Sequence, residues 1–271
     1  TNYEMAIDPF YIEFARDVFA RGTAEVGMHL HAWNSPPTEP LTADDWRHKP
    51  YLIEYSDAMM REKVDYMTRL LEDTFQTKMV SHRAGRWAFD ERYARLLVEY
   101  GYQVDCSVTP RVNWKTAKGA PQGDGGTDYR RFPQHAYFLD ENDISREGHS
   151  PLLEVPMSIQ YKHSAWMNSV KQGYDRLRGK VRSPSVHWLR PMGGNVETMK
   201  KVVEQTLTQG NDYVEYMLHS SEYMPGGSPT FQNERDIERL YADLEAFFSW
   251  LAPQVKGMTL AEYYQRKITQ R

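Results

Sequence analysis

The chain has 271 residues, of which 40% are hydrophobic and 26% are charged, and its formal net charge is −4. This composition provides for a sizeable globular core, and the acidic balance argues against a nucleic-acid binder, which usually presents a basic face. No apolar run approaches the roughly 18 residues of a membrane span, and no signal-peptide pattern is present. The single cysteine excludes an intrachain disulfide.

The first predicted elements are a helix, a strand and a second helix. Asp8-Pro9, followed by apolar residues at helical spacing, predicts a capped helix that ends at Gly22. The apolar run over 26–30 predicts a strand. A long helix is expected from about Ser56 to Phe75, where apolar side chains again recur at helical spacing.

Strands and helices alternate along the rest of the chain. Strands are expected over 78–81, 102–106, 152–159, 186–189 and 213–218, and helices after Asp90, Asn195, Asn233 and Thr259. The region 109–150 is rich in glycine and proline, and it predicts a long loop insertion within one domain spanning 1–271. The basic segment 171–182 predicts a solvated helix or loop, or a contact to an anionic substrate.

The alternation of strands and helices predicts an α/β fold with a mostly parallel sheet and helices outside it. Such a sheet is either open or closed into a (β/α) barrel. Polar side chains follow several of the predicted strands, and the loops of a barrel converge on one mouth. The pattern therefore favours a barrel.

Two histidines end the first predicted strand. His29 and His31 are two residues apart, so in a strand they share one face. Neutral imidazole is a ligand for Zn, Fe, Ni and Cu, and strand ends carry the active sites of α/β folds. The pair thus predicts half of a metal site. The alternative is a histidine that hydrogen-bonds backbone where the strand turns into the loop.

Other polar or aromatic residues stand where predicted strands end, and each has a structural alternative. Arg83 and Arg86 could pair with acidic residues at a helix entry, which contributes little when exposed. His219 could be a structural histidine with satisfied hydrogen bonds. Tryptophans such as Trp33 either belong to the core or line a sugar-binding groove, where flat apolar faces stack on pyranose rings.

Five stretches occur in an order that resembles the polysaccharide deacetylase (NodB-homology, carbohydrate esterase 4) family. The resemblance covers most of the chain and is nearest to the branch found in O-antigen and exopolysaccharide gene clusters. It implies a distorted (β/α) barrel. The stretches are Glu25–His29, Arg83–Arg86, Val104–Ser107, Glu154–Pro156 and Met217–Ser220.

The family resemblance also implies an activity. It implies a metal-dependent hydrolase that removes the acetyl group from an N-acetylated sugar of a bacterial surface polysaccharide, such as an O-antigen, or of its precursor. The implied cofactor is one divalent metal, usually zinc, held by two histidines and an aspartate. An aspartate acts as base and a histidine protonates the leaving amine. The implied partner is a carbohydrate.

The resemblance assigns roles to individual residues. His29 matches the first metal histidine and His219 the general acid. Arg83 matches the arginine that positions the catalytic aspartate, and Asp105 matches the acid that orients the histidine. We expect substrate contacts from other side chains at the strand ends, which are Trp33, Arg86, Arg190 and Glu222.

The chain departs from the family pattern at two places. The second metal histidine usually comes four residues after the first, where this chain has Trp33, so His31 is expected to take its place. The opening Asp-Asp segment, which supplies the base and the third metal ligand, is not found. Either the 271 residues are part of a longer protein with a further first strand, or the protein lacks the usual base.

These departures keep two further functions open. One is a non-catalytic carbohydrate-binding or assembly protein on the same barrel, and the other is a hydrolase that acts on a non-sugar amide. The lack of an export signal indicates a cytoplasmic protein, or a periplasmic one if an N-terminal signal has been lost.

Overall fold

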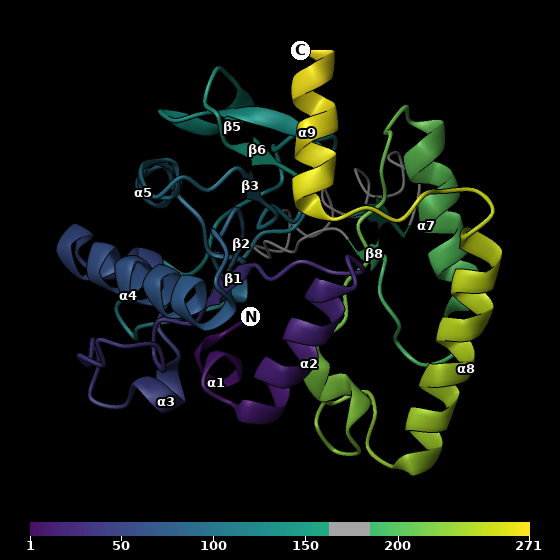
Figure 1. The fold of residues 1–271 in the computed structure, drawn as a ribbon, viewed down its shortest axis with the longest axis horizontal. Coiled ribbons are helices and arrows are strands. Elements are labelled where there is room, and N and C mark those ends of the chain that lie inside the picture. The colour runs from purple at the N-terminus through teal and green to yellow at the C-terminus, as the bar shows by residue number, and fades with distance from the viewer. Residues whose placement is uncertain (163–184) are drawn as a thin grey trace, which may run out of the picture. The chain divides into compact units, whose positions relative to one another are not determined.

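The computed structural model describes residues 1–162 and 185–271, and Figure 1 traces their elements. The chain forms two compact units, one comprising residues 1–108, 112–156 and 258–271 and the other residues 109–111 and 157–257. The expected single domain stays a prediction, because this division does not decide whether either unit folds alone. The basic segment 171–182 lies outside the described residues.

The first unit is built on an open six-stranded sheet with the order β1-β2-β3-β6-β4-β5. Four strands run parallel, and each is only two to four residues long: β1 (Met28–Leu30), β2 (Ser81–Ala84), β3 (Val104–Asp105) and β6 (Leu153–Glu154). The observed class is thus mixed α/β with a mostly parallel sheet. No strand among the described residues closes this sheet, so the predicted barrel is not confirmed.

Three helices of this unit begin where the sequence predicts, two of them after the predicted caps Asp8 and Asp90. Each cap side chain accepts a hydrogen bond from a backbone N–H in the first turn. The helices are α2 (Pro9–Ala20) after Asp8, α4 (Asp57–Phe75) after Ser56 and α5 (Glu91–Glu99) after Asp90. The apolar side of α4 packs against β1 (Figure 1).

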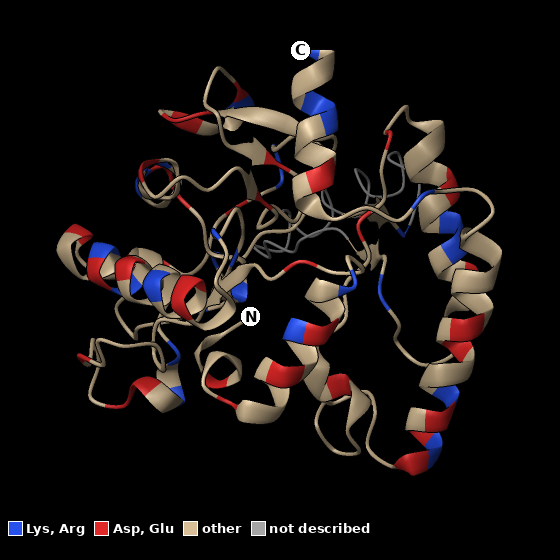
Figure 2. Ribbon diagram, viewed as in Figure 1, with Lys and Arg blue, Asp and Glu red and all other residues tan. Residues whose placement is uncertain are grey.

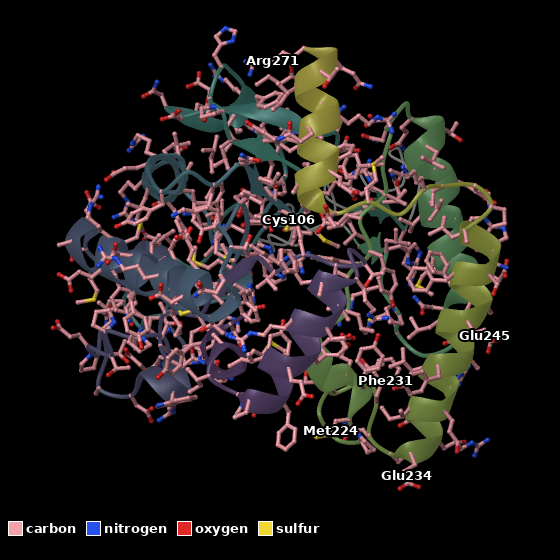
Figure 3. All side chains as sticks on the ribbon, viewed as in Figure 1. Cys106, Met224, Phe231, Glu234, Glu245 and Arg271 are labelled. Atoms are coloured by element: carbon pink, nitrogen blue, oxygen red, sulfur yellow. The ribbon has the colours of Figure 1, made fainter. Side chains whose placement is uncertain are left out.

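Several shorter elements complete the first unit. They are α1 (Tyr3–Ala6), α3 (Asp45–His48), the 3₁₀ helices η1 (Leu52–Glu54) and η2 (Gly85–Trp87), and the C-terminal helix α9 (Leu260–Gln270). α9 contacts β3, so the end of the chain belongs to the same unit as its beginning. Cys106, which follows β3, is buried (Figure 3).

The expected loop over 109–150 is interrupted by a β-hairpin. β4 (Tyr137–Asp140) pairs antiparallel with β6 and with β5 (Asp143–Glu147). Tyr137 and Leu139 are buried in alternation with more exposed neighbours, which is the pattern of a strand with one face on a core. The alternation is too short to stand out in a region rich in glycine and proline.

The second unit combines a two-stranded antiparallel sheet with helices. The strands are β7 (Ile159–Tyr161) and β8 (Val186–Trp188). α7 (Val196–Thr208) packs against both strands and against α8 (Glu234–Leu251). The apolar core of this unit consists of Leu189, Met199, Val202, Val203, Phe247 and Leu251.

A short helix and a connection precede α8. The 3₁₀ helix η3 (Ser220–Tyr223) contacts α8, and Figure 3 shows Met224 and Phe231 on the connection between them. Acidic and basic residues intermingle along α4 and α8 (Figure 2), as on helix faces that meet solvent. None of the described helices combines the length and the apolar character needed to cross a bilayer.

The strand predicted over 213–218 does not form a ladder in the described structure. Its backbone makes isolated hydrogen bonds instead: Met217 N donates to Leu189 O at 3.1 Å, and Glu215 N donates to Ser158 Oγ at 2.9 Å. A β-ladder requires repeated backbone pairs. The predicted strand is therefore wrong, although the segment still leads directly into His219.

Candidate functional site

The two histidines at the end of β1 lie against each other. The ring centroids of His29 and His31 are 4.5 Å apart, with their planes 72° from parallel. Nδ1 of His29 is 2.8 Å from the carbonyl oxygen of Arg83, and because a carbonyl only accepts, Nδ1 carries the proton. Nε2 is then the nitrogen with a free lone pair.

Burial is the main influence on His29. It holds the pKa of this imidazole well below its usual range, and the charges of His31 and Arg83 act in the same direction. The hydrogen bond to the Arg83 carbonyl acts in the opposite direction and does not prevail. His29 is consequently neutral near pH 7, which is the form of imidazole that binds metals.

Gly85 gives the histidine pair its space. β1 and β2 pair in register, so that His29 faces Arg83 across the ladder, and Gly85 comes directly after β2. A Cβ atom on Gly85 would lie 2.3 Å from the carbonyl oxygen of Leu30 and 2.6 Å from Cδ2 of His31. Only glycine allows the two strand ends to approach this closely.

Aromatic side chains surround the pair within the first unit. The indole of Trp33 stacks on His31, with centroids 4.5 Å apart and planes 14° from parallel. The guanidinium carbon of Arg83 lies 5.1 Å from the ring centroid of Trp87. The structure therefore brings together His29, His31, Trp33 and Arg83, which the sequence predicts as neighbours.

Arg86 is engaged within the fold. Its guanidinium lies 4.1 Å from the centroid of Tyr51, and it donates to the carbonyl oxygens of Lys49 and Lys118. These contacts hold the loop after β2 to two other segments of the same unit. A substrate contact by Arg86 stays a prediction.

Asp105 forms a buried network with a histidine that the sequence analysis did not single out. Its Oδ1 is 2.5 Å from Nδ1 of His82, and it also accepts a hydrogen bond from Ser107 Oγ at 2.8 Å. Nε2 of His82 lies 2.6 Å from the hydroxyl of Tyr93. His82 and Asp105 face each other in the register of β2 and β3.

The environment of Asp105 favours its charged form. Burial raises its pKa, but hydrogen bonds and the charge of His82, together with the bonds from Ser107 and Glu154, outweigh burial and lower it. The side chains of His82 and Asp105 are fully buried. The acid that was expected to orient the catalytic histidine thus orients His82 in the core.

His219 has a carboxylate partner within the second unit. Oε2 of Glu222 accepts a hydrogen bond from the backbone N–H of His219 at 2.9 Å and lies 3.3 Å from its Nδ1. Oε1 of Glu222 accepts a hydrogen bond from Nη2 of Arg190 at 2.6 Å. The His219 side chain is 54% exposed, whereas that of Glu222 is 2% exposed.

These contacts keep Glu222 ionised. Burial raises its pKa, but the two hydrogen bonds from His219 and the charge of Arg190 outweigh burial and lower it. Since a carboxylate accepts, Nδ1 of His219 carries the proton in this contact, and the imidazole as a whole is 54% exposed. The arrangement is suited to proton transfer through Nε2.

The sequence analysis missed two of these roles. Glu222 contacts His219 and Arg190 contacts Glu222, whereas the expected substrate contacts of Glu222 and Arg190 stay predictions. The spacing His219-Ser220-Ser221-Glu222 carried a signal, because a residue three positions after an N-cap can return its side chain to the cap. His82 offered no comparable signal, since its partner comes from a strand 23 residues later.

The expected metal site is only partly represented. The described residues include no group of three or more His, Cys, Asp or Glu side chains placed to hold a metal ion. His29 and His31 supply two imidazoles, whereas catalytic zinc usually has three protein ligands. The described residues therefore supply two of the ligands of the implied site and do not complete it.

Comparisons with known proteins support the fold. No family model and no curated protein matches the sequence. The structure is similar to a crystal structure described as "putative polysaccharide deacetylase from Mycobacterium smegmatis", with a TM-score of 0.52. The two are 16% identical, and the match covers 96% of this chain and 68% of that chain. At this identity the likeness establishes a shared α/β architecture.

Proposed function

We propose that this protein is a hydrolase that removes the acetyl group from an N-acetylated sugar of a bacterial surface polysaccharide, such as an O-antigen, or of its precursor. The single observation that carries the proposal is the pairing of the exposed His219 with the buried Glu222. The fold shared with the Mycobacterium smegmatis structure, itself described as a deacetylase, makes this reaction class the best supported one.

The pair supplies one half of the chemistry of amide cleavage. The amine of an acetylated sugar is a poor leaving group unless it is protonated as the carbon–nitrogen bond breaks. His219, when doubly protonated, can donate a proton from Nε2 to that nitrogen. Glu222 stabilises the imidazolium through Nδ1, and Arg190 holds Glu222 in place. Both are positioning residues, whereas His219 is the proposed catalytic acid.

Activation of water is the chemistry that a divalent cation such as zinc would supply in such a hydrolysis. His29 and His31 are the residues of this chain that we propose as ligands, with Arg83 beside them. The third ligand is not among the described residues. Calorimetric titration with zinc tests this part, and His29→Ala and His31→Ala should each abolish any binding seen. Zinc affinity that survives both changes would remove the assignment.

Acetate release tests the proposal as a whole. The protein, supplied with zinc, is incubated with a panel of N-acetylated saccharides, and His219→Gln is compared with wild type. Loss of a general acid costs about 10²–10⁴-fold in rate, so the variant should lose activity on that scale while remaining folded. His135→Gln is the matched control, because the exposed His135 also pairs with a carboxylate, that of Glu147 at 2.7 Å. No acetate from any member of the panel would refute the proposal.

A second candidate is a non-catalytic carbohydrate-binding or assembly protein. The observation that favours it is that the described residues offer two imidazoles and no third metal ligand. Trp33 and Trp87 would then serve binding alone. Saturable binding of an oligosaccharide, weakened by Trp33→Ala and accompanied by no acetate release with any divalent cation, would support this candidate over the hydrolase.

A further inference from the structure

Lys63 is a fully buried lysine whose ammonium group is held by backbone. It lies on α4 with 0% of its surface exposed. Its Nζ donates hydrogen bonds to the carbonyl oxygen of Ser35 at 2.8 Å and to that of Pro37 at 2.6 Å. The ring of Tyr55 covers Nζ, at 5.2 Å from its centroid. A buried ammonium requires such compensation, because desolvation of a charge is costly.

The charged groups around Lys63 keep it protonated at neutral pH. Burial lowers its pKa to about 8, while Asp45 on α3 and Glu39 in the preceding loop act in the opposite direction. Asp45 also accepts a hydrogen bond from the Tyr55 hydroxyl at 3.0 Å. The ammonium group therefore faces two carbonyls, one aromatic ring and the field of two carboxylates.

The two carbonyls belong to the loop 34–37, which directly follows the candidate site. The carbonyl oxygen of His31 accepts hydrogen bonds from the backbone N–H of Ser35 at 3.1 Å and of Asn34 at 3.4 Å. The same turn carries Trp33, whose ring stacks on His31. A shift of the loop would therefore move the backbone to which both rings are attached.

We propose that Lys63 is a positioning residue: its ammonium group fixes the loop 34–37 to α4 and thereby holds the stacked side chains of His31 and Trp33 in place. The role of these two side chains in substrate or metal binding rests on the proposed function, but their placement by Lys63 does not. Helix α4 thus contributes directly to the shape of the site through Lys63.

The test follows Trp33 by ¹⁹F NMR of protein labelled with 5-fluorotryptophan, with the resonance assigned by Trp33→Phe. Lys63→Met keeps the length of the side chain and removes its donors. We expect the Trp33 resonance to shift or broaden and that of Trp114, in the same unit, to stay. Lys78→Met is the matched control, because Lys78 is exposed and pairs with Glu72; it should change neither resonance. A folded Lys63→Met protein with an unchanged Trp33 resonance would overturn the proposal.

A second measurement decides the matter if Lys63→Met does not fold. Hydrogen exchange in the wild-type protein compares the amides of Asn34 and Ser35 with that of Val64 on α4. Positioning by Lys63 requires the loop amides to be protected nearly as well as the helix amide. Exchange faster by several orders of magnitude would show that the loop opens independently of α4, and the proposal would be wrong.

Activity gives a separate readout. In a folded Lys63→Met protein kcat/KM should fall by about one order of magnitude, because displacement of Trp33 weakens substrate binding and displacement of His31 slows the chemical step. If the wild-type protein released acetate from none of the substrates, only the proposed function would be contradicted. The NMR and hydrogen-exchange tests of Lys63 do not depend on turnover.

Discussion

Glu222 contacts His219 through both the backbone and the side chain of the histidine, with one carboxylate oxygen 2.9 Å from its N and 3.3 Å from its Nδ1. The second oxygen is bound by Arg190. The carboxylate is therefore fixed from three directions while the imidazole stays accessible. This is the arrangement in which a histidine keeps one tautomer and can exchange protons through its outer nitrogen.

Replacement of Glu222 by glutamine tests this tautomer. The amide keeps the size of the side chain but offers only one acceptor oxygen, which Arg190 would retain. The amide N–H₂ would then face both the backbone N–H and Nδ1 of His219, so the hydrogen bond from the backbone N–H is lost and Nδ1 should change from donor to acceptor. In the variant, we expect the ¹⁵N chemical shifts of His219 to show that its neutral imidazole carries the proton on Nε2. We also expect kcat to fall by about 10²–10⁴-fold. Unchanged nitrogen shifts would show that Glu222 does not set the tautomer.

The buried pair of Asp105 and His82 leads to a prediction about stability. Asp105→Asn replaces the carboxylate that accepts hydrogen bonds from His82 and Ser107 in the core, and loss of a hydrogen bond to a charged group costs about 1.5–3 kcal/mol. Denaturant unfolding should show this loss, and Asp124→Asn, at an exposed carboxylate, should not. If Asp105 instead orients His219, as the sequence predicted, Asp105→Asn would lower activity and leave the unfolding midpoint unchanged.

The contact between Asp105 and His82 also predicts how the free energy of unfolding changes at acidic pH. The pKa of Asp105 is lower in the folded protein than its ordinary value of 3.8. A depressed carboxylate pKa means that the unfolded chain binds the proton more readily, so the contribution to stability is present above the ordinary value and is lost as the pH falls through the folded value. Acid unfolding curves of wild type and Asp105→Asn should therefore converge at low pH.

Sequence reasoning placed the helices well and the strands less well. Asp8, Ser56 and Asp90 are local signals that act within one turn, so they could be read without knowledge of the fold. The strands are two to five residues long, and their pairing depends on partners far along the chain. The segment 213–218 has a strand-like composition, but with the described part of the chain it makes isolated backbone bonds and no ladder.

In the candidate site, too, local contacts could be predicted from the sequence and long-range contacts could not. His29, His31 and Trp33 lie on one stretch of chain, so their proximity could be predicted from the sequence. The partner of Asp105 could not be predicted, because it depends on the register between β2 and β3. The carbonyls that hold Lys63 could not be predicted either, since an apolar helix side gives no reason to expect a buried charge.

The lowered pKa of Lys63 predicts that the free energy of unfolding rises at alkaline pH. Its pKa is lowered to about 8 in the folded protein, against 10.5 in an unperturbed lysine. Between these values the unfolded chain binds more protons than the folded protein, so the free energy of unfolding should rise with pH, by at most about 1.4 kcal/mol per pH unit from this group. Tyrosines titrate in the same range, and the difference between wild type and Lys63→Met isolates the lysine. Parallel curves for the two proteins would contradict the prediction.

Gly85 offers a steric test of the histidine pair. Gly85→Ala places a Cβ atom 2.3 Å from the carbonyl oxygen of Leu30, which is backbone and cannot rotate away. Overpacking of this kind typically costs about 1–3 kcal/mol, and relief requires the end of β1 to move and His31 with it. We expect a lower unfolding midpoint and a displaced His31 ring signal in NMR spectra. Gly257→Ala is the matched control, because no atom lies within 4 Å of its added Cβ, so it should be neutral or slightly stabilising. Equal stability of the two variants would mean that the strand ends are not as closely apposed as their distances indicate, and that β1 does not hold His31 in a fixed position.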